Sequence, residues 1–586
     1  MMNDILKGLN NEQKKAVLAT DNALVIACPG SGKTRVLTRK IAYELNQITS
    51  SKQMIVAFTF TTNAAEEIYS RVEEMDLSTE NLWIGTFHSF CSQWIIKPYG
   101  MYHNELNLGF SYATDYYQNK VLKEIKAESG LKFFDNVNTK FNRAGEYTNK
   151  IHKFNEVAKL YHQRLKEEKL IDYNQIIYFS YQLIKTHPKI SINLSNLFKY
   201  ILVDEYQDTQ DLQYGIIGEI IKNSHGKSKL FMVGDPEQNI YSSIGGIAKT
   251  KDEIQKDLGD NKLVEVKLNG NYRSTQRIVD FCKSFQLEQR EVVSLAVLKN
   301  SRGIITFDDK IHSNEVTDEI ANLVRSYINK GHAPNEICIA APQWFMLNQG
   351  VRKLKQALPD IAFAAPDLTP LPKQTDNFYS KLSRILCTPS SPKMYLHRLR
   401  WSKEIVEQLN ETCNSSWPNN KSSCIKLLNL MKRCKSHQSN IREYLEQSFE
   451  MIMVELNLDF YTYPDLALMY QLFFEQLDEK LKIPEYPQDI NSILNLHEPK
   501  TGIAIKSFHG VKGEEYETVI AFGLLEGYIP HWNEISDRTV SKRLLYVLCS
   551  RAKKNLHLFS ETNRYTGKGY PYKTNRELKN VEFEYD

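Results

Sequence analysis

Two adjacent carboxylates, Asp204 and Glu205, directly follow the apolar run Ile201-Leu202-Val203. An aliphatic run of this kind is typical of a strand buried on both faces of a parallel sheet, and such sheets bind ligands beyond the carboxyl ends of their strands. One acid placed there could hold a divalent metal ion while the other orients a water molecule. The same pair could instead only cap a following helix, so other motifs must decide.

A second segment suited to chemistry, residues 23–37, combines a strand pattern, a glycine-rich turn and a helical pattern. The turn reads Cys28-Pro29-Gly30-Ser31-Gly32-Lys33-Thr34, which is typical of a phosphate-binding P-loop. Its backbone N–H groups can surround phosphate oxygens, and the helix N-terminus adds its positive dipole end. Lys33 would reach the β- and γ-phosphates, and Thr34 would be a hydroxyl ligand of Mg²⁺. Ala27 replaces the usual first glycine, a small-for-small change, so the sequence predicts an ATPase or GTPase.

Composition narrows the class of protein. A chain of 586 residues is too long for a single domain. Its hydrophobic residues make up 42% and its charged residues 25%, which is ordinary for a globular protein. The net charge of +4 gives no evidence for nucleic-acid binding, so any DNA site must be a local groove. The start Met1-Met2-Asn3-Asp4 lacks a signal-peptide pattern, no apolar run reaches membrane-spanning length, and the nine cysteines form no Cys-x-x-Cys pair. We expect a cytoplasmic protein without a membrane partner.

Short aliphatic strands alternate with helical stretches in two blocks, which predicts an α/β fold with two parallel-sheet domains. The first block comprises 24–27, 54–59, 200–204, 230–234 and 264–268; the second comprises 303–307, 337–341, 502–506, 518–522 and 556–559. Between the strands lie two strand-poor, helical segments. The predicted boundaries are 1–97 with 196–283 for the first domain, 98–195 for its insertion, 284–365 with 500–586 for the second domain, and 366–499 for a reduced helical insertion.

Seven further segments accompany the two nucleotide motifs in a fixed order. They are Leu9-Asn10-Asn11-Glu12-Gln13, residues 59–67, Gly85-Thr86-Phe87-His88-Ser89, residues 233–241, Asn271-Tyr272-Arg273-Ser274-Thr275, residues 509–516 and residues 546–553. Together with residues 204–209, this series closely resembles the UvrD/Rep family of superfamily 1A DNA helicases. The resemblance runs from Leu9 to Lys554 and implies two RecA-like domains, ATP and Mg²⁺ as cofactors, and 3′-to-5′ movement on single-stranded DNA or on a duplex with a single-stranded end.

The resemblance also implies roles around the nucleotide. Gln13 would read adenine, since an amide both donates and accepts hydrogen bonds. Tyr272 would stack on the base, with Arg35 on its other face. Glu515 would contact the ribose. The phosphates would lie against the turn that contains Ser31.

Further residues would carry the hydrolysis. Asp204 would bind Mg²⁺ together with Thr34, Glu205 would activate the attacking water, and Gln238 would sense the γ-phosphate. Two arginines, Arg273 and Arg551, would neutralise charge on the transferring phosphoryl group. Arg551 lies in the second block, so hydrolysis would require both domains to close on ATP.

For the DNA, family positions that line the single-strand groove are matched by Phe60, Thr61, His88, Tyr241 and His509. Rings can stack on bases of any sequence, while hydroxyls hold phosphates. For Phe60 and Phe87 the alternative is core packing, because both lie near buried strands.

Two departures from the family pattern leave function classes open. Ser243 and Ile244 stand where an aromatic residue and an arginine are usual, and Val540 and Ser541 replace an acidic pair. The missing base platform favours, as an alternative to a helicase, a DNA-sensing regulatory ATPase that gates a partner nuclease. The compact build and residues 511–523 are similar to the helicase subunit of Gabija anti-phage systems, whose partner is an OLD-type nuclease. A P-loop protein unrelated to nucleic acid is a third reading.

Overall fold

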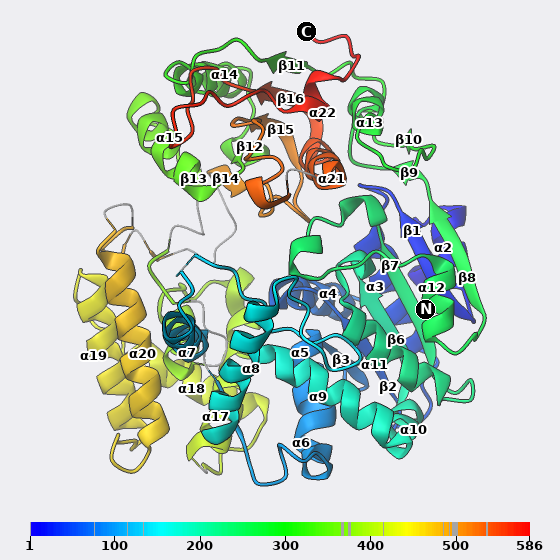
Figure 1. Ribbon diagram of the computed structural model, residues 1–586, viewed down its shortest axis with the longest axis vertical. Coiled ribbons are helices and arrows are strands. Elements are labelled where there is room, and N and C mark those ends of the chain that lie inside the picture. The colour runs from blue at the N-terminus through cyan, green and yellow to red at the C-terminus, as the bar shows by residue number, and fades with distance from the viewer. Residues whose placement is uncertain are drawn as a thin grey trace. The chain divides into compact units, whose positions relative to one another are not determined.

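The computed structural model describes residues 2–75, 77–113, 115–132, 134–364, 369–372, 377–413, 415–483, 486–491, 493–494, 502–534 and 537–586 (Figure 1). Contacts divide the chain into two units. The first comprises residues 1–113, 118–361 and 505–586, and the second comprises residues 114–117 and 362–504.

A six-stranded sheet forms the first half of the first unit. Its strands are β1 (Asn22–Ala27), β2 (Met54–Phe58), β3 (Leu82–Gly85), β6 (Phe198–Asp204), β7 (Lys229–Gly234) and β8 (Leu263–Leu268). They run in the order β3-β2-β6-β7-β1-β8, and every neighbouring pair is parallel. The carboxyl ends of β6, β7 and β1 therefore lie side by side at one edge of the sheet.

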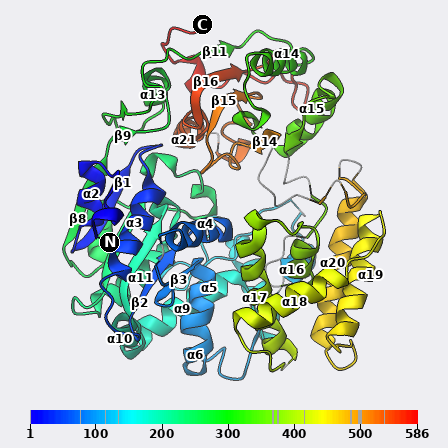
Figure 2. The same cartoon turned by 180° about the vertical axis from the view of Figure 1, so that it is seen from behind.

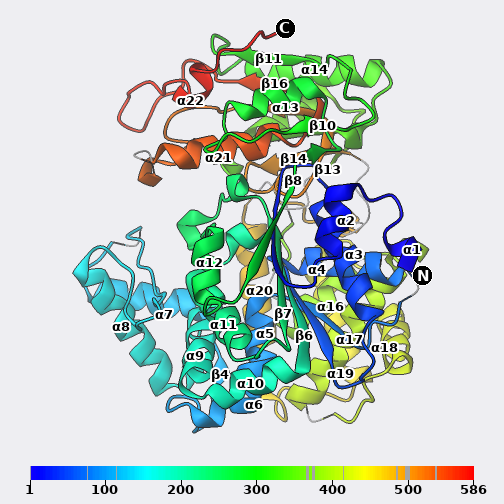
Figure 3. The ribbon, with the colours of Figure 1, turned by 90° about the vertical axis from the view of Figure 1, so that its right-hand side faces the viewer.

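Helices cover both faces of this sheet. Figure 3 shows α2 (Asn11–Val17) and α3 (Lys33–Leu45) on one side of β6, β7 and β8, and α11 (Asp211–Lys222) and α12 (Lys251–Asp257) on the other. Alternate strand residues enter two different cores: Leu24 and Ile201 pack toward α11, whereas Val25 and Leu202 pack toward α3. Burial on both faces explains why these strands are continuous apolar runs.

A second parallel arrangement follows in the same unit. It contains β11 (Ile305–Asp308), β16 (Ala552–Phe559), β15 (Tyr516–Ala521), β12 (Ile337–Ala341) and β14 (Ile503–Ser507), in this spatial order. Figure 1 shows the red strand β16 beside the green strand β11, because Ile305 pairs with Leu556 across 251 positions of the chain. The accompanying helices are α13 (Gln276–Lys283), α14 (Val316–Asn329), α15 (Trp344–Ala357) and α21 (Arg538–Cys549).

The segment between β3 and β6 is largely helical. Its main elements are α5 (Phe87–Phe90), a π-helical stretch (Cys91–Ile96), α6 (Lys97–Tyr99), α7 (Asp115–Glu128), α8 (His152–Glu167), α9 (Tyr173–Thr186) and α10 (Pro188–Leu197). A further helix, α4 (Thr62–Glu73), lies between β2 and β3. The short strands β4 (Ser111–Tyr112) and β5 (Leu170–Ile171) pair in parallel.

The second unit is a helical cluster, which Figure 2 shows with α16 to α20 grouped together. The helices are α16 (Phe378–Leu386), α17 (Tyr395–Cys413), α18 (Lys421–Arg433), α19 (Ile441–Glu455) and α20 (Pro464–Leu481). Their apolar faces form one core that includes Tyr379, Leu427, Phe449 and Phe473. β13 (Phe363–Ala364) pairs with Ile503 and Ala504, the first residues of β14.

The predicted fold class is confirmed, since two parallel sheets alternate with helices. All ten expected strands are present. Nine of them lie within two residues of their predicted ends, whereas β16 begins four residues before its predicted start, and the four-residue strand β3 was not predicted. The domain boundaries stay predictions. Among the described residues, no helix is both long and apolar enough to cross a membrane.

Candidate active site

The turn between β1 and α3 is shaped by two glycines in the left-handed region. Gly30 has φ +69° and Gly32 has φ +83°, and α3 begins at the next residue, Lys33. A Cβ at Gly30 would lie 2.7 Å from Cβ of Arg273, so the close approach of the segment that contains Arg273 also requires glycine here. Within the turn, the buried Ser31 Oγ has no hydrogen-bond partner among the described residues. An orphaned hydroxyl beside a helix N-terminus is what a bound phosphate would satisfy.

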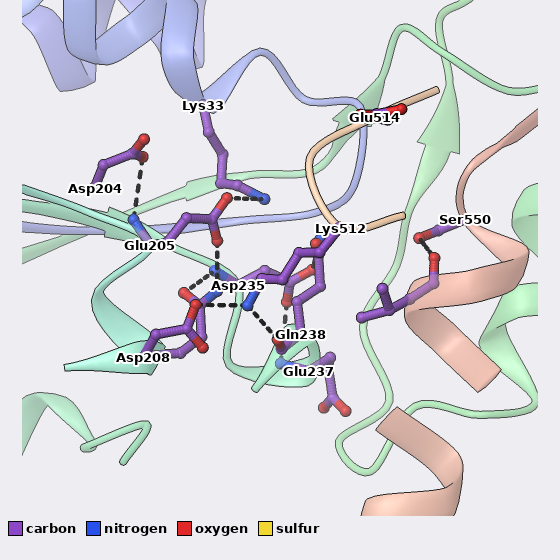
Figure 4. A network of polar contacts seen from close by, with 12 residues as sticks. Lys33, Asp204, Glu205, Asp208, Asp235, Glu237, Gln238, Lys512, Glu514 and Ser550 are labelled. Atoms are coloured by element: carbon purple, nitrogen blue, oxygen red, sulfur yellow. Dashed lines mark hydrogen bonds and ion pairs between the residues drawn. The ribbon is translucent and has the colours of Figure 1, made fainter. Parts of the chain in front are cut away.

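Asp204 and Glu205 lie at the end of β6, as the sequence predicted (Figure 4). Glu205 has φ +49°, a conformation that strains a residue with a side chain by about 1–3 kcal/mol and is characteristic of functional sites. Its carboxylate lies 3.5 Å from the Lys33 ammonium and accepts a 2.5 Å hydrogen bond from Gln207 Nε2. The backbone N–H of Glu205 donates to Asp204 Oδ1 at 3.1 Å. The strand end thus places both acids beside the P-loop lysine.

The electrostatic environments of the two acids differ. Burial and the negative charge of Glu205 raise the pKa of Asp204 above its ordinary value. Burial would also raise the pKa of Glu205, but the charges of Lys33 and Lys512 outweigh it and hold that pKa low. Glu205 therefore stays ionised, as a general base must, while an ionised Asp204 gains from a nearby cation. The donor set of Asp204 and the Thr34 hydroxyl fits a divalent metal ion.

Arg551 lies in the turn between α21 and β16 in the second half of the unit, and it reaches the short helix (Pro236–Gln238) that follows β7. Its Nη2 donates to Gln238 Oε1 at 3.0 Å, while its Nε donates to Val547 O at 2.9 Å. Gln238 is held in turn by a 2.8 Å bond from its Nε2 to Asp235 Oδ2. Burial, with the nearby charge of Arg273, lowers the pKa of Arg551 to about 9, so the guanidinium is charged at neutral pH.

Lys512 connects the two halves of the first unit, although its position in the sequence predicts no role for it. Its ammonium donates to Asp208 Oδ2 at 2.6 Å and to Gln238 O at 2.9 Å (Figure 4). Asp208 belongs to the segment that follows Glu205, so this ion pair joins residues 304 positions apart. The available signal was the position of Lys512 inside the motif 509–516, but spacing alone does not identify its partner.

The structure places the second predicted arginine differently. Arg273 Nε donates to Glu515 Oε2 at 2.7 Å, and its Nη1 donates to Ser550 O at 3.0 Å. Lys553 lies 3.0 Å from the other oxygen of Glu515. Burial acts to raise the pKa of Glu515, but both cations outweigh it and lower that pKa. Of the two arginines, only Arg551 contacts Gln238 in the described structure.

The residues predicted to hold the base lie near the turn. Gln13 is buried, and its Nε2 donates to Ser31 O at 2.9 Å, while its Oε1 accepts from Asn10 N. Tyr272 is 43% exposed, and its hydroxyl accepts a 2.7 Å bond from Asn10 Nδ2. Arg35 is exposed on α3. The structure brings these residues together around the P-loop, with Gln13 bonded to the turn itself.

The predicted DNA residues form an aromatic surface beside the acids. Phe60 is 42% exposed and stacks on Tyr241, with ring centroids 4.7 Å apart, and His509 lies 6.0 Å from Tyr241. Thr61 is exposed and caps α4, and the His88 ring meets Tyr173 edge-on at 5.6 Å. Core packing does not account for Phe60. It does account for Phe87, which is buried and stacks on Phe58 at 4.0 Å.

A cavity of about 220 Å³ connects these features. Its lining includes Phe60, His88, Asp204, Glu205 and Ile244. The cavity therefore touches the predicted DNA surface and both acids, Asp204 and Glu205, at once. Ile244 is 46% exposed, so an aliphatic side chain occupies the place where an arginine was expected.

Comparison with known proteins agrees with this geometry. Residues 9–258 match the UvrD/REP helicase N-terminal domain, and residues 395–563 match the UvrD-like helicase C-terminal domain. The chain belongs to the UvrD/Rep helicase family. Membership makes it an ATP-hydrolysing enzyme of the DNA helicase class.

Among curated members of the UvrD/Rep family, similar proteins match nearly the whole chain. A probable DNA helicase II homolog of Mycoplasma capricolum is 25% identical over 99% of this chain and 87% of its own length. The ATP-dependent DNA helicase PcrA of Staphylococcus epidermidis is 24% identical over 96% of this chain and 84% of its own length. PcrA of Staphylococcus aureus is 25% identical with the same coverage.

Proposed function

We propose that this protein couples ATP hydrolysis to movement along single-stranded DNA, with 3′-to-5′ polarity. The observation that carries the proposal is the contact of Arg551, which directly precedes β16 of the second sheet, with Gln238, which follows β7 of the first. A residue that completes the phosphate site from another domain makes hydrolysis depend on the relative position of the two sheets. Such dependence is the requirement for a motor.

The chain supplies the groups for phosphoryl transfer. Asp204 and Thr34 would hold Mg²⁺, which when bound neutralises charge on the phosphate oxygens. Glu205, ionised and 3.5 Å from Lys33, accepts the proton of the attacking water. Arg551 is charged and already directed at Gln238, so it can stabilise negative charge on the transferring group. Gln13, Tyr272, Arg35 and Glu515 bind the nucleoside in this proposal.

Coupling to DNA is supported by the cavity beside Glu205. Phe60 and Tyr241 offer stacked rings to bases, and Phe60 lines the same cavity as the acid that activates water. Lys512 joins Asp208 to the motif that contains His509. A DNA base that displaces these rings would therefore also shift residues at the nucleotide site. Thr61, His88 and His509 complete the proposed DNA surface.

The second candidate is a DNA-sensing regulatory ATPase that gates a partner nuclease with little unwinding of its own. Exposed Ile244, with Ser243 before it, leaves the DNA cavity without the base platform expected at that position. An OLD-type nuclease in a Gabija-type phage defence system is the partner we propose for this role. DNA repair is the alternative setting, and either would operate in the cytoplasm.

Strand displacement separates the two candidates. The purified chain is given a duplex with a 3′ single-stranded tail, a duplex with a 5′ tail and a blunt duplex, each with ATP and Mg²⁺. A motor of the proposed polarity separates the 3′-tailed duplex alone. Single-strand-stimulated ATP hydrolysis without displacement, together with co-purification of a nuclease whose cutting responds to ATP, supports the regulator. Lys33→Ala is the inactive control, and Lys7→Ala, on the exposed surface, is the matched lysine control.

A further inference from the structure

The helical segment between β3 and β6 contains a cavity of about 1170 Å³. None of its lining residues lines the cavity beside Asp204. Small-molecule sites usually measure about 300–1,000 Å³, so this cavity can hold a flat ligand and its substituents. Its walls include Phe141, Tyr147, His162 and Tyr178, to which neither the sequence nor the proposed function gives a role.

Most neighbouring rings of this wall are nearly parallel, although Phe141 and Tyr147 meet at 33°. The Phe141 ring is parallel to His162, at 4.9 Å and 16°, and to Tyr178, at 4.3 Å and 19°. Tyr147 is also nearly parallel to His162, at 5.6 Å and 22°. A set of nearly parallel rings beside an open volume is suited to receive another flat ring by stacking.

Hydrogen bonds behind the rings fix what the two hydroxyls can do. His162 Nε2 lies 3.2 Å from Asp172 Oδ2, and Tyr147 Oη lies 3.0 Å from His162 Nδ1. Because the buried carboxylate accepts, Nε2 carries the proton, Nδ1 accepts from Tyr147, and the Tyr147 oxygen is left as an acceptor. Gln182 Nε2 donates to Tyr178 Oη at 2.7 Å, so the Tyr178 proton can point to a ligand. The wall thus offers one acceptor and one donor.

The loop that carries Phe141 and Tyr147 is anchored rather than loose. Between them, Arg143 forms ion pairs with Asp211 at 2.9 Å and with Asp257 at 2.7 Å. Gly145 has φ +86°, and a Cβ there would collide with the Tyr178 hydroxyl. A pocket whose walls are already fixed before binding loses less conformational entropy when a ligand binds.

Charge narrows the ligand class. Lys159 and Lys166 line the cavity, but Glu105 and Glu167 line it too, so the two positive and two negative side-chain charges balance. A phosphate-rich ligand would find little net attraction there. Stacking with paired donor and acceptor groups therefore dominates, which favours a heterocyclic base.

We propose that this pocket binds an unpaired nucleobase, presented by a free nucleotide or by single-stranded DNA. The site goes beyond the proposed function, which uses other residues. It has a physical route to the motor: Lys140, the neighbour of Phe141, donates to Ile244 O, and Ile244 lines the cavity beside Asp204 and Glu205. A base held by the loop can therefore influence the proposed DNA groove.

Photo-crosslinking tests the proposal on the full chain. A single-stranded oligonucleotide that contains 5-iodouracil is irradiated with the protein, and the crosslinked peptides are mapped. A separate arm uses 5-iodo-dUMP alone. We expect crosslinks within residues 98–195, at the rings of this pocket. If they occur with the oligonucleotide alone, the ligand is a base of single-stranded DNA. If they also occur with 5-iodo-dUMP, the pocket is a site for a free nucleotide. Crosslinks at Phe60 or Tyr241 report on the proposed groove in the same sample, so the two proposals can fail separately.

Variants sharpen the result. Phe141→Ala should reduce crosslinking in the pocket roughly five- to 160-fold, because one stacked base contributes about 1–3 kcal/mol. Tyr147→Phe keeps the ring and should reduce it about fivefold, the value of one neutral hydrogen bond. Phe134→Ala, an exposed ring of the same segment outside the lining, is the matched control. Pocket crosslinks that are absent in both arms, or unchanged in Tyr147→Phe and in a folded Phe141→Ala, overturn the proposal.

Discussion

Removal of the Lys512 ammonium would leave the buried carboxylate of Asp208 without its ion-pair partner. The side chains of Lys512 and Asp208 are 9% and 2% exposed, and their charged atoms are 2.6 Å apart. At an effective dielectric constant of 20, the gross attraction is about 6 kcal/mol. Desolvation of both groups offsets most of it, yet removal of one partner from a buried pair costs about 3–5 kcal/mol, because the other charge is left alone.

We expect Lys512→Met to destabilise the contact between the two sheets, so that it opens locally more often. The chain has more than one domain, so a single unfolding free energy is not well defined, and local amide exchange is the better measurement. Exchange in the peptides around Asp208 and Gln238 should accelerate roughly 160- to 5,000-fold, the equivalent of 3–5 kcal/mol. Asp208→Asn combined with Lys512→Met should restore most of the protection, since no buried charge remains.

The pH dependence has a definite sign. Burial raises the pKa of Asp208 to about 6, although Lys512 opposes the rise. A carboxyl whose pKa is higher in the folded state than in the unfolded state destabilises the fold as pH increases through that value. Loss of Lys512 raises the pKa further, so the excess exchange of Lys512→Met should be larger at pH 8 than at pH 6. Additive effects of the two substitutions, or a difference that does not change with pH, would refute the reasoning.

Three further predictions concern the nucleotide and DNA sites. Glu205→Gln should lower the ATPase kcat at least 100-fold while ATP affinity, measured with a fluorescent ATP analogue, stays within about threefold, whereas Lys33→Ala should lose both; loss of affinity in Glu205→Gln contradicts its role as the base. Arg551→Lys should lower kcat about 1,000-fold because an ammonium cannot reproduce the geometry of a guanidinium that donates to Gln238 and Val547, and an unchanged kcat in steady-state assays would remove Arg551 from the site. Phe60→Ala and Tyr241→Ala should each weaken single-stranded DNA binding by about 1–3 kcal/mol, equally for oligo(dT) and mixed sequences in a fluorescence anisotropy titration, with Phe345→Ala as an exposed aromatic control; a sequence-dependent loss would argue against stacking.

Much of the fold could be read from the sequence because burial on both faces leaves continuous apolar runs. Ile201-Leu202-Val203 is such a run, and it became β6 with the acids at its end. β3 was missed because Leu82–Gly85 is only four residues long and alternates between buried and half-buried positions. Edge strands of this length carry little periodic signal.

The candidate site was predicted in its motifs but not in its pairings. The sequence assigned Lys33, Glu205, Gln238 and Arg551 to one phosphate site, because each belongs to a motif with a known chemical role. It could not show that Arg273 forms an ion pair with Glu515 or that Lys512 forms one with Asp208. These partners are 242 and 304 positions apart, so their pairing depends on how the two sheets dock. The left-handed conformation of Glu205 was also invisible, because nothing in residue type marks a glutamate for positive φ.

The most direct test of the coupling between ATP hydrolysis and DNA is the steady-state ATPase rate with and without single-stranded oligo(dT) at low salt, where phosphate contacts are strongest. We expect the oligonucleotide to raise kcat at least tenfold in the wild-type chain and to leave Arg551→Lys near its unstimulated rate. An ATPase rate that DNA does not change would contradict the proposal that both sheets close on the nucleotide when DNA is bound.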